Sequence, residues 1–321
     1  MIRSDTFNVA FLLLISTAIS SCKEKSAGQA EASLPDQFIM VLGVAQDAGY
    51  PQAGCEKACC QHYWSGEHKE ERVVSLGIVD KKAGKVWMIE ATPDFKSQWH
   101  DLNEKAGLNN TSPDGIFLTH AHVGHYTGLM ELGREIMGAA SVPVYGMPVM
   151  RSFLTQNGPW SQLVALENIS LQKLAADSTI QLSPDISITP FLVPHRDEFS
   201  ETVGYRIESG RKGVIFIPDI DKWSKWDRNI RELVASADVA FLDATFFRNG
   251  EIDRDMSEVP HPFVKESMAL LKDLPESDRR KVHFIHFNHT NPLIWSNEEQ
   301  ENVKNNGFNI SREGDIFELV N

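Results

Sequence analysis

Apolar residues in this chain fall into short runs separated by glycine, proline and charged positions, a pattern typical of buried β-strands. The run 38–43 predicts the opening strand of the core, and 73–79 and 85–90 predict two strands joined by a turn at 81–84. The same pattern predicts further strands at 115–118, 142–146, 186–193, 203–208, 213–217, 239–243 and 282–286. Helices are predicted at 95–106, 128–137, 147–157 and 263–271.

Several of these strands end in a residue that can bind a metal ion. His120, His195, Asp219 and His286 each stand at or just beyond the end of a predicted strand. A lone histidine after a strand is more often an ordinary core or surface residue. Four such ends in one chain suggest that the edges of the sheets converge on one site.

The densest signal is the segment 119–125, which holds three histidines, His120, His122 and His125, within six residues. Neutral imidazole is the commonest protein ligand for zinc and similar ions. Catalytic zinc sites keep one coordination position open for water, so the segment predicts a metal-dependent hydrolase. The alternative is a histidine-rich loop with ordinary hydrogen bonds.

The N-terminal residues are predicted to lie outside the fold. The apolar stretch 9–19 is too short to span a bilayer as a mature helix, and residues 19–22 resemble the lipobox of a bacterial lipoprotein signal peptide. The resemblance implies a signal peptide at 1–21 and lipid attachment to Cys22, and therefore a protein anchored to a membrane of the bacterial cell envelope. An ordinary secretory signal is the alternative. The polar segment 22–36 is predicted to be a flexible tether.

The formal net charge of −13 argues against a nucleic-acid partner, because neutralisation of phosphates dominates that affinity. Residues 37–321 are enough for one large domain with a full core. The expected partners are therefore a small-molecule substrate and, through Cys22, a membrane. The sequence does not indicate an oligomeric state.

Three further cysteines stand close together. Cys55, Cys59, Cys60 and His62 could form a structural zinc site with three thiolates and one imidazole. In an exported protein, a disulfide is the competing interpretation. Adjacent Cys59 and Cys60 rarely pair with each other, so a bridge would join Cys55 to one of them and leave an odd thiol.

With these histidines in view, the stretch from Phe38 to about Trp295 resembles the metallo-β-lactamase fold superfamily, whose pattern is His-x-His-x-Asp-His followed by a distant His, an Asp and a final His. The resemblance implies an α/β fold, a four-layer αββα sandwich with the metals at one edge of two packed sheets. It implies a first metal held by His120, His122 and His195. It implies a second metal held by His125 and His286, with Asp219 bridging the two. One or two zinc ions are expected, with iron or manganese as alternatives.

One position departs from the superfamily pattern, because Gly124 stands where the motif has aspartate. The second site then lacks an anionic ligand, which lowers its affinity for divalent ions. Three interpretations follow: a single-metal enzyme, a binuclear site completed by another residue, or a degraded site. His261 is a candidate substitute ligand, although it could be an ordinary loop histidine. Asp47, which follows the first strand, could line the pocket or simply belong to a turn.

A narrower resemblance is to the pyrroloquinoline-quinone biosynthesis protein B group. It rests on residues 41–52, the cysteine cluster, 91–94 and, most specifically, the tail 286–292. The cysteines are spaced differently from those of that group, and a lipobox is out of place in its pathway. We therefore expect a relative of the group that does not perform its step.

The sequence leads to a prediction of function with two alternatives. The leading prediction is a hydrolase that acts outside the cytoplasm on an ester, phosphodiester or amide-type small molecule through a metal-bound hydroxide. Asp219 would orient the hydroxide, and His286 or His261 would stabilise charge on the leaving group. One alternative is an iron-dependent oxidative enzyme like biosynthesis protein B. The other, which Gly124 favours, is a non-catalytic metal-binding lipoprotein.

Overall fold

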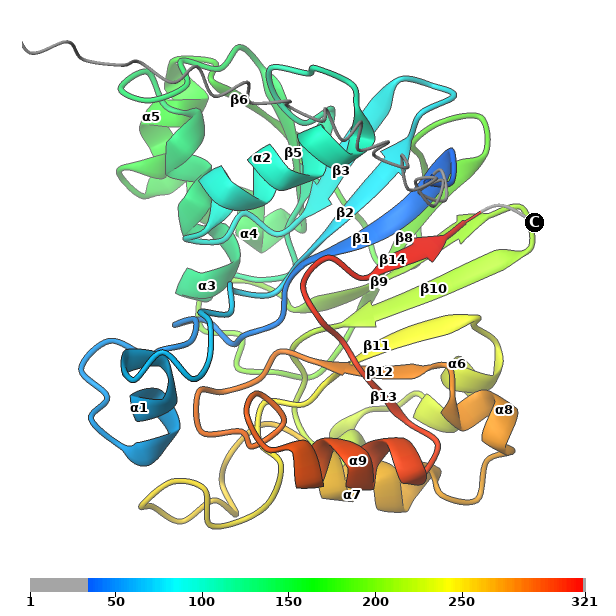
Figure 1. Cartoon of the computed structure of the whole chain (residues 1–321). Helices are drawn as coiled ribbons and strands as arrows, with labels where there is room; N and C mark the ends of the chain where they lie inside the picture. The colour runs from blue at the N-terminus through cyan, green and yellow to red at the C-terminus, as the bar shows by residue number, and fades with distance from the viewer. Residues whose placement is uncertain (1–33, 320–321) are drawn as a thin grey trace, which may run out of the picture. The chain divides into compact units, whose positions relative to one another are not determined.

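Two seven-stranded mixed sheets pack face to face in the computed structural model, which describes residues 34–319. The outer face of each sheet is covered by helices (Figure 1), which gives the four-layer α/β sandwich that the resemblance implied. The predicted signal peptide and Cys22 lie outside the described residues. Within residues 34–319, no helix is both long enough and apolar enough to cross a membrane.

The first sheet has the strand order β14-β1-β2-β3-β4-β5-β6. Its strands are β1 (Gln37–Gly43), β2 (Ser75–Asp80), β3 (Lys85–Ile89), β4 (Gly115–Phe117), β5 (Val142–Gly146), β6 (Ile169–Lys173) and β14 (Ile316–Glu318). The strands from β3 to β6 are parallel, and those from β14 to β3 are antiparallel. The helical segments between its strands are α1 (Ala58–Trp64), α2 (Phe95–Ala106), α3 (Val123–Tyr126), the 3-10 helix η1 (Thr127–Leu132), α4 (Pro148–Gln156) and α5 (Trp160–Ala165).

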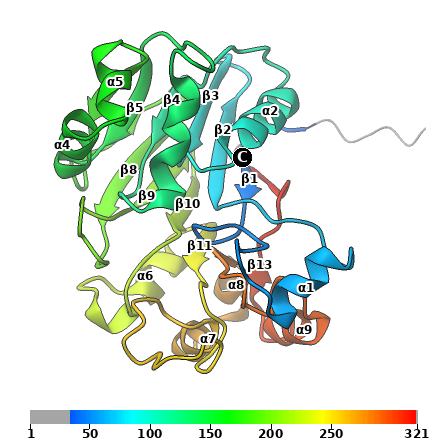
Figure 2. The same ribbon diagram turned by 90° about the vertical axis from the view of Figure 1, so that its left-hand side faces the viewer.

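The second sheet has the order β13-β12-β11-β10-β9-β8-β7. Its strands are β7 (Ile180–Gln181), β8 (Ile186–Leu192), β9 (Val203–Ser209), β10 (Lys212–Ile217), β11 (Val239–Asp243), β12 (Val282–Ile285) and β13 (Asn309–Ile310). Those from β10 to β13 are parallel. Its helical segments are the 3-10 helix η2 (Trp223–Lys225), α6 (Ile230–Ala235), α7 (Val264–Leu271), α8 (Glu276–Arg279) and α9 (Asn297–Asn305), and the view in Figure 2 shows α6 to α9 on the side of the sheet away from β1 to β6.

The side chains of β1 explain why its sequence is a continuous apolar run. Phe38 and Met40 pack toward helix α2 in the core between the first sheet and its helices. Ile39 and Val41 belong to the other core, between the two sheets. A strand covered on both faces has no solvent-facing positions, so alternation of polar and apolar residues disappears.

The strand directions bring the predicted functional residues to one edge. β3 and β4 run parallel in the first sheet, and β8, β10, β11 and β12 all run one way in the second. In α/β sheets, ligands bind beyond the carboxyl ends of parallel strands. One local prediction is wrong: the helix expected at 128–137 is only the short 3-10 helix η1, followed by turns.

Candidate metal centre

The six side chains predicted as metal ligands meet at this edge. His120 follows β4, His195 follows β8, Asp219 follows β10 and His286 follows β12, while α3 carries His125. The backbone of His286 has a positive φ of 69°. Such backbone strain in a non-glycine residue persists where surrounding contacts fix it, and it is concentrated at functional sites.

The first group of donors is compact. Donor atoms of His120, His122, His195 and Asp219 all lie within 4.8 Å of one another. Nε2 of His120 is 2.8 Å from Nδ1 of His122 and 3.3 Å from Oδ2 of Asp219. Nε2 of His195 is 3.2 Å from Oδ1 of the same carboxylate. With metal–ligand distances of about 2.1 Å, donors of one tetrahedral site stand roughly 3–4 Å apart, so this spacing fits a single ion.

The second group shares Asp219. Nε2 of His125 and Nε2 of His286 lie 3.9 and 4.0 Å from Oδ2 of Asp219. Oδ1 of Asp47, in the loop after β1, is 3.1 Å from Nε2 of His125, and the donors of Asp47, His125 and His286 also fall within 4.8 Å of one another. Asp219 therefore lies between two clusters, as expected of a bridging ligand.

Buried hydroxyl groups set the tautomers of two imidazoles. Thr119 donates its hydroxyl hydrogen to Oε1 of Glu90 (2.5 Å), so its oxygen accepts from Nδ1 of His120 (2.9 Å). Thr245 donates to Oδ1 of Asp243 (2.7 Å), so its oxygen accepts from Nδ1 of His286 (2.8 Å). Both histidines then turn an unprotonated Nε2 toward Asp219. Such outer hydrogen bonds are typical of metal-ligating histidines.

Glu90, Asp243 and the two threonines were not predicted as site residues. Glu90 and Asp243 each stand at the end of a predicted strand, as the histidines do, so the same signal pointed to them. Glu90 is fully buried and also contacts Nδ1 of His125 at 3.1 Å. Thr119 and Thr245 carry no comparable signal, because threonine is common at strand ends.

Several buried polar atoms at the centre of the site have no hydrogen-bond partner among the described residues. They are Nε2 of His125, both ring nitrogens of His195, Oδ1 of Asp219, Nε2 of His286 and Oδ1 of Asp47. Unpaired buried polar atoms are costly, and native proteins rarely keep them without a ligand or ion. Imidazole nitrogens and carboxylate oxygens are the donors that zinc, iron and manganese accept, so the residues present fit a metal.

The charge balance of the site also suits a cation. Burial and the neighbouring His125 lower the pKa of His120 well below its usual value, which keeps this imidazole neutral and able to bind a metal. Burial favours the neutral form of Asp219, but the nearby imidazoles of His195, His261 and His286 hold its pKa well below the usual range. Asp219 is therefore an anion in a buried site.

His261 lies between two carboxylates rather than in the loop periphery. Its Nδ1 is 2.9 Å from Oδ2 of Asp243 and 3.2 Å from Oδ1 of Asp219. Burial opposes its protonation, but Asp243 and Asp219 together raise the pKa of His261 to about 10. His261 also belongs to a group of possible ligands with Asp219, Asp243 and His286, so the structure brings this candidate ligand to the centre.

The cysteine cluster has a different histidine from the one we expected. Cys55, Cys59 and Cys60 gather around His289, with donor atoms within 4.8 Å of one another. His62, in α1, instead bonds to Glu67 (2.7 Å) and stacks on Trp295, which lies in the segment before α9. The three thiols are free, with 3.9 Å between Sγ of Cys55 and Sγ of Cys59, so the cluster suits a metal better than a disulfide.

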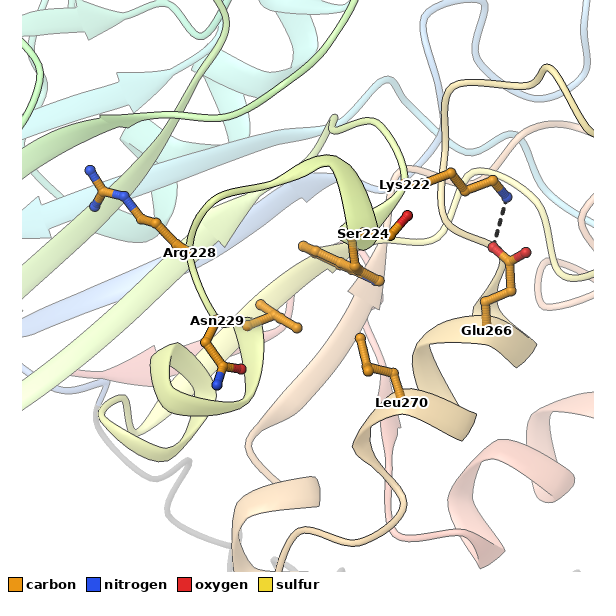
Figure 3. A pocket seen from close by; sticks show the side chains of 8 residues that line it. Lys222, Ser224, Arg228, Asn229, Glu266 and Leu270 are labelled. Carbon is orange, nitrogen blue, oxygen red and sulfur yellow. Dashed lines mark hydrogen bonds and ion pairs between the residues drawn. The ribbon is translucent and has the colours of Figure 1, made fainter.

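A cavity of about 610 Å³ adjoins the histidine site. Its lining includes Asp47, Arg196, Arg254, His261 and His289. A separate cavity of about 520 Å³ lies among η2, α6 and α7 (Figure 3), where Lys222 and Glu266 pair at 2.7 Å. This second cavity includes none of the metal-donor groups, whereas the lining of the first includes Asp47 and His261.

Comparison with known proteins identifies the class. The sequence model of a beta-lactamase superfamily domain matches residues 87–287, and the chain therefore belongs to this superfamily. Coenzyme PQQ synthesis protein B of Methylorubrum extorquens (strain PA1) is 26% identical over 308 residues, which cover 88% of this chain and 99% of that protein. The protein of the same name from Klebsiella pneumoniae (strain 342) is 28% identical over 310 residues, which cover 86% of this chain and 96% of that protein.

Two solved structures have the same fold. The crystal structure of zinc-bound PqqB from Methylobacterium extorquens matches with a TM-score of 0.74 and 22% identity, covering 88% of this chain and all of that one. A diphosphatase from the PhnP family matches with a TM-score of 0.63 and 23% identity, covering 88% of this chain and 96% of that one.

These comparisons overturn one prediction. We expected a lipid-anchored protein of the cell envelope, and that placement is wrong. The relatives that the chain matches over nearly their whole length are coenzyme synthesis proteins, and a synthesis step of that kind does not belong with an envelope lipoprotein.

Proposed function

We propose that this protein is a metal-dependent enzyme that acts on a small anionic molecule, with chemistry related to that of coenzyme PQQ synthesis protein B. The observation that carries the proposal is the set of unpaired donor atoms on His125, His195, Asp219 and His286, buried beside a cavity of about 610 Å³. A donor set that only stabilised the fold would not need a cavity at its side.

The metal would be held by the donors that the resemblance indicated. His120, His122 and His195 form the first site with Asp219, and His125 and His286 belong to the second. The zinc in the PqqB structure of the same fold supports zinc here, and imidazole with carboxylate serves iron and manganese as well. When bound, such an ion supplies Lewis acidity and, if it is iron, redox chemistry.

The chain's own residues suggest the class of substrate. Arg196 and Arg254 both line the cavity, and within residues 34–319 the ion pair of Arg196 is a long contact of 3.9 Å with Glu198. The chain has a net charge of −13, so two arginines in the lining of this cavity are a local exception. Guanidinium groups bind carboxylates and phosphates, and we assign these two to an anionic group of the substrate.

The relatives favour a reaction on a cofactor precursor, because they are coenzyme synthesis proteins, and iron at the site would make that reaction oxidative. His261 favours hydrolysis as a second candidate. It lines the cavity, and Asp243 and Asp219 raise its pKa, which favours the protonated form that can donate a proton to a leaving group. The hydrogen bond between its Nδ1 and Oδ2 of Asp243 (2.9 Å) fixes the orientation of the ring.

The test begins with bound metals, measured by elemental analysis of the wild type and His120→Ala. Loss of metal in the variant supports the proposal, and equal metal content in the two proteins overturns it. The reaction class follows from loading the protein with iron or zinc. Oxygen consumption with the iron form supports oxidation, whereas turnover of phosphodiester or ester substrates by the zinc form supports hydrolysis.

A further inference from the structure

We propose that Asp47 supplies the carboxylate that Gly124 lacks, so that the second metal site is complete. This inference rests on the proposed metal centre and adds a ligand from a different part of the chain. Asp47 lies in the loop after β1, far in sequence from the histidine motif that α3 continues.

Asp47 occupies the place that an aspartate side chain at position 124 would take. A Cβ built on Gly124 would lie 2.4 Å from Cα of Asp47 and 2.5 Å from its Oδ1. Real Cβ atoms essentially never approach other atoms this closely. Asp47 therefore fills the volume into which a side chain at position 124 would project.

With Asp47 included, the second site has four donors. Nε2 of His125, Nε2 of His286 and Oδ1 of Asp47 lie within 4.8 Å of one another, and Oδ2 of Asp219 lies 3.9 and 4.0 Å from the two imidazole nitrogens. Two imidazoles and two carboxylates are the same set, in number and type, as the superfamily pattern with its motif aspartate. Four such donors suit a zinc ion, whereas the two imidazoles and one shared carboxylate that remain without Asp47 form a weaker site.

A proton between His125 and Asp47 is the competing explanation for their closeness. Oε1 of Glu90 already lies 3.1 Å from Nδ1 of His125 and is placed to accept its proton. On the other side, Nε2 of His125 and Oδ1 of Asp47 are 3.1 Å apart, yet neither atom has a hydrogen-bond partner among the described residues. An N–H at Nε2 does not point at the carboxylate. A metal ion that lies to one side of the line between Nε2 of His125 and Oδ1 of Asp47 would accept a lone pair from each atom.

The loop that carries Asp47 is tied to the segment that carries His286. The backbone N–H of Gln46 donates to the carbonyl of Phe287 (2.8 Å), and that of Phe287 donates to the carbonyl of Val44 (2.8 Å). The side-chain amide of Asn288 donates to Oε1 of Gln46 (2.6 Å). Two ligands of the same ion are thus fixed to each other before the ion binds, which metal sites require.

The test is metal stoichiometry at a fixed free zinc concentration in the wild type, Asp47→Asn, His120→Ala and, as a matched control, Asp94→Asn. Asparagine at position 47 keeps the shape and removes the charge. Asp94 lines a cavity together with Asp47, but its carboxylate accepts the backbone N–H of Val73 (2.8 Å), which an asparagine oxygen can also accept. Any metal at the thiols is common to all four proteins, so differences count only the histidine centre.

We expect Asp47→Asn to lose one equivalent of zinc, with affinity for it reduced at least 10–100-fold, while Asp94→Asn matches the wild type. Circular dichroism and thermal unfolding would check that each variant is folded. Equal zinc content and affinity in Asp47→Asn and wild type would overturn the role of Asp47 while leaving the metal centre intact. Unchanged zinc in His120→Ala would instead overturn the proposed function itself.

Discussion

Replacing Gly124 by alanine tests the packing on which the second metal site depends. The added methyl group would meet the backbone of Asp47 at 2.4 Å, whereas ordinary contacts begin at about 3.4 Å. The neighbour is a Cα atom rather than the end of a flexible side chain, so rotation of a side chain cannot relieve the clash. The loop after β1 must therefore move by about 1 Å away from His125.

A shift of this size is large for a metal site, where ligand distances hold within about 0.2 Å. Asp47 would leave the second site, and we expect zinc affinity there to fall at least 10–100-fold. The strain of overpacking should also lower the free energy of unfolding by about 1–3 kcal/mol. The first site, formed by His120, His122 and His195, should keep its metal.

The assay is zinc stoichiometry and affinity, with thermal unfolding measured on the same samples. Gly158→Ala is the matched control, because a Cβ at Gly158 would meet no atom within 4 Å. If Gly124→Ala binds as much zinc as the wild type, with the same affinity, the loop is not held against position 124 and the reasoning fails. A loss of zinc in both variants would point to general destabilisation instead.

Three further predictions follow from other parts of the structure. Arg254→Gln should weaken the binding of inorganic phosphate to the metal-loaded protein about fivefold by calorimetry, because an exposed ion pair contributes up to about 1 kcal/mol; unchanged affinity would remove this residue from the substrate site. Burial, together with the charge of Glu313, raises the pKa of Glu71 to about 7, so the wild type loses stability as the pH rises from 4.5 through 7. Glu71→Gln should therefore be more stable by about 3 kcal/mol at pH 8 in urea unfolding and should show no advantage at pH 4.5, and equal stability at both pH values would contradict this. His289→Ala should lose any metal held by the thiols, measured by elemental analysis, whereas His62→Ala should keep it; the reverse result would restore His62 as the ligand.

The fold and the main cluster of histidines could be predicted because their signals are local. Each buried strand is an apolar run, and the residue that ends the run is visible in the sequence. Parallel strands carry these ends to one edge, so His120, His195, Asp219 and His286 meet without any knowledge of loop conformations. The helix expected at 128–137 was wrong because an amphipathic run does not by itself distinguish a full helix from a 3-10 turn.

The partners that sequence reasoning missed are those that only tertiary structure brings together. His62 is the histidine nearest the cysteines in sequence, but its ring is engaged by Glu67 and Trp295. His289 reaches the thiols from the segment after β12, more than 200 residues away in the chain. Asp47 was equally compatible with a turn, because nothing in its neighbourhood shows which loop will pack on α3.

Gly124 has a different meaning once the loop after β1 is in place. Taken alone, a glycine in a motif that normally has aspartate favours a degraded site. In the structure, the same glycine is the one residue small enough to let Asp47 approach His125. The second metal site requires one carboxylate at a defined position. Either residue 47 or residue 124 can supply it, but not both, because the two side chains would occupy the same volume. The absence of a side chain at position 124 is therefore what the ligand at position 47 requires, and Gly124 ceases to be an argument against catalysis.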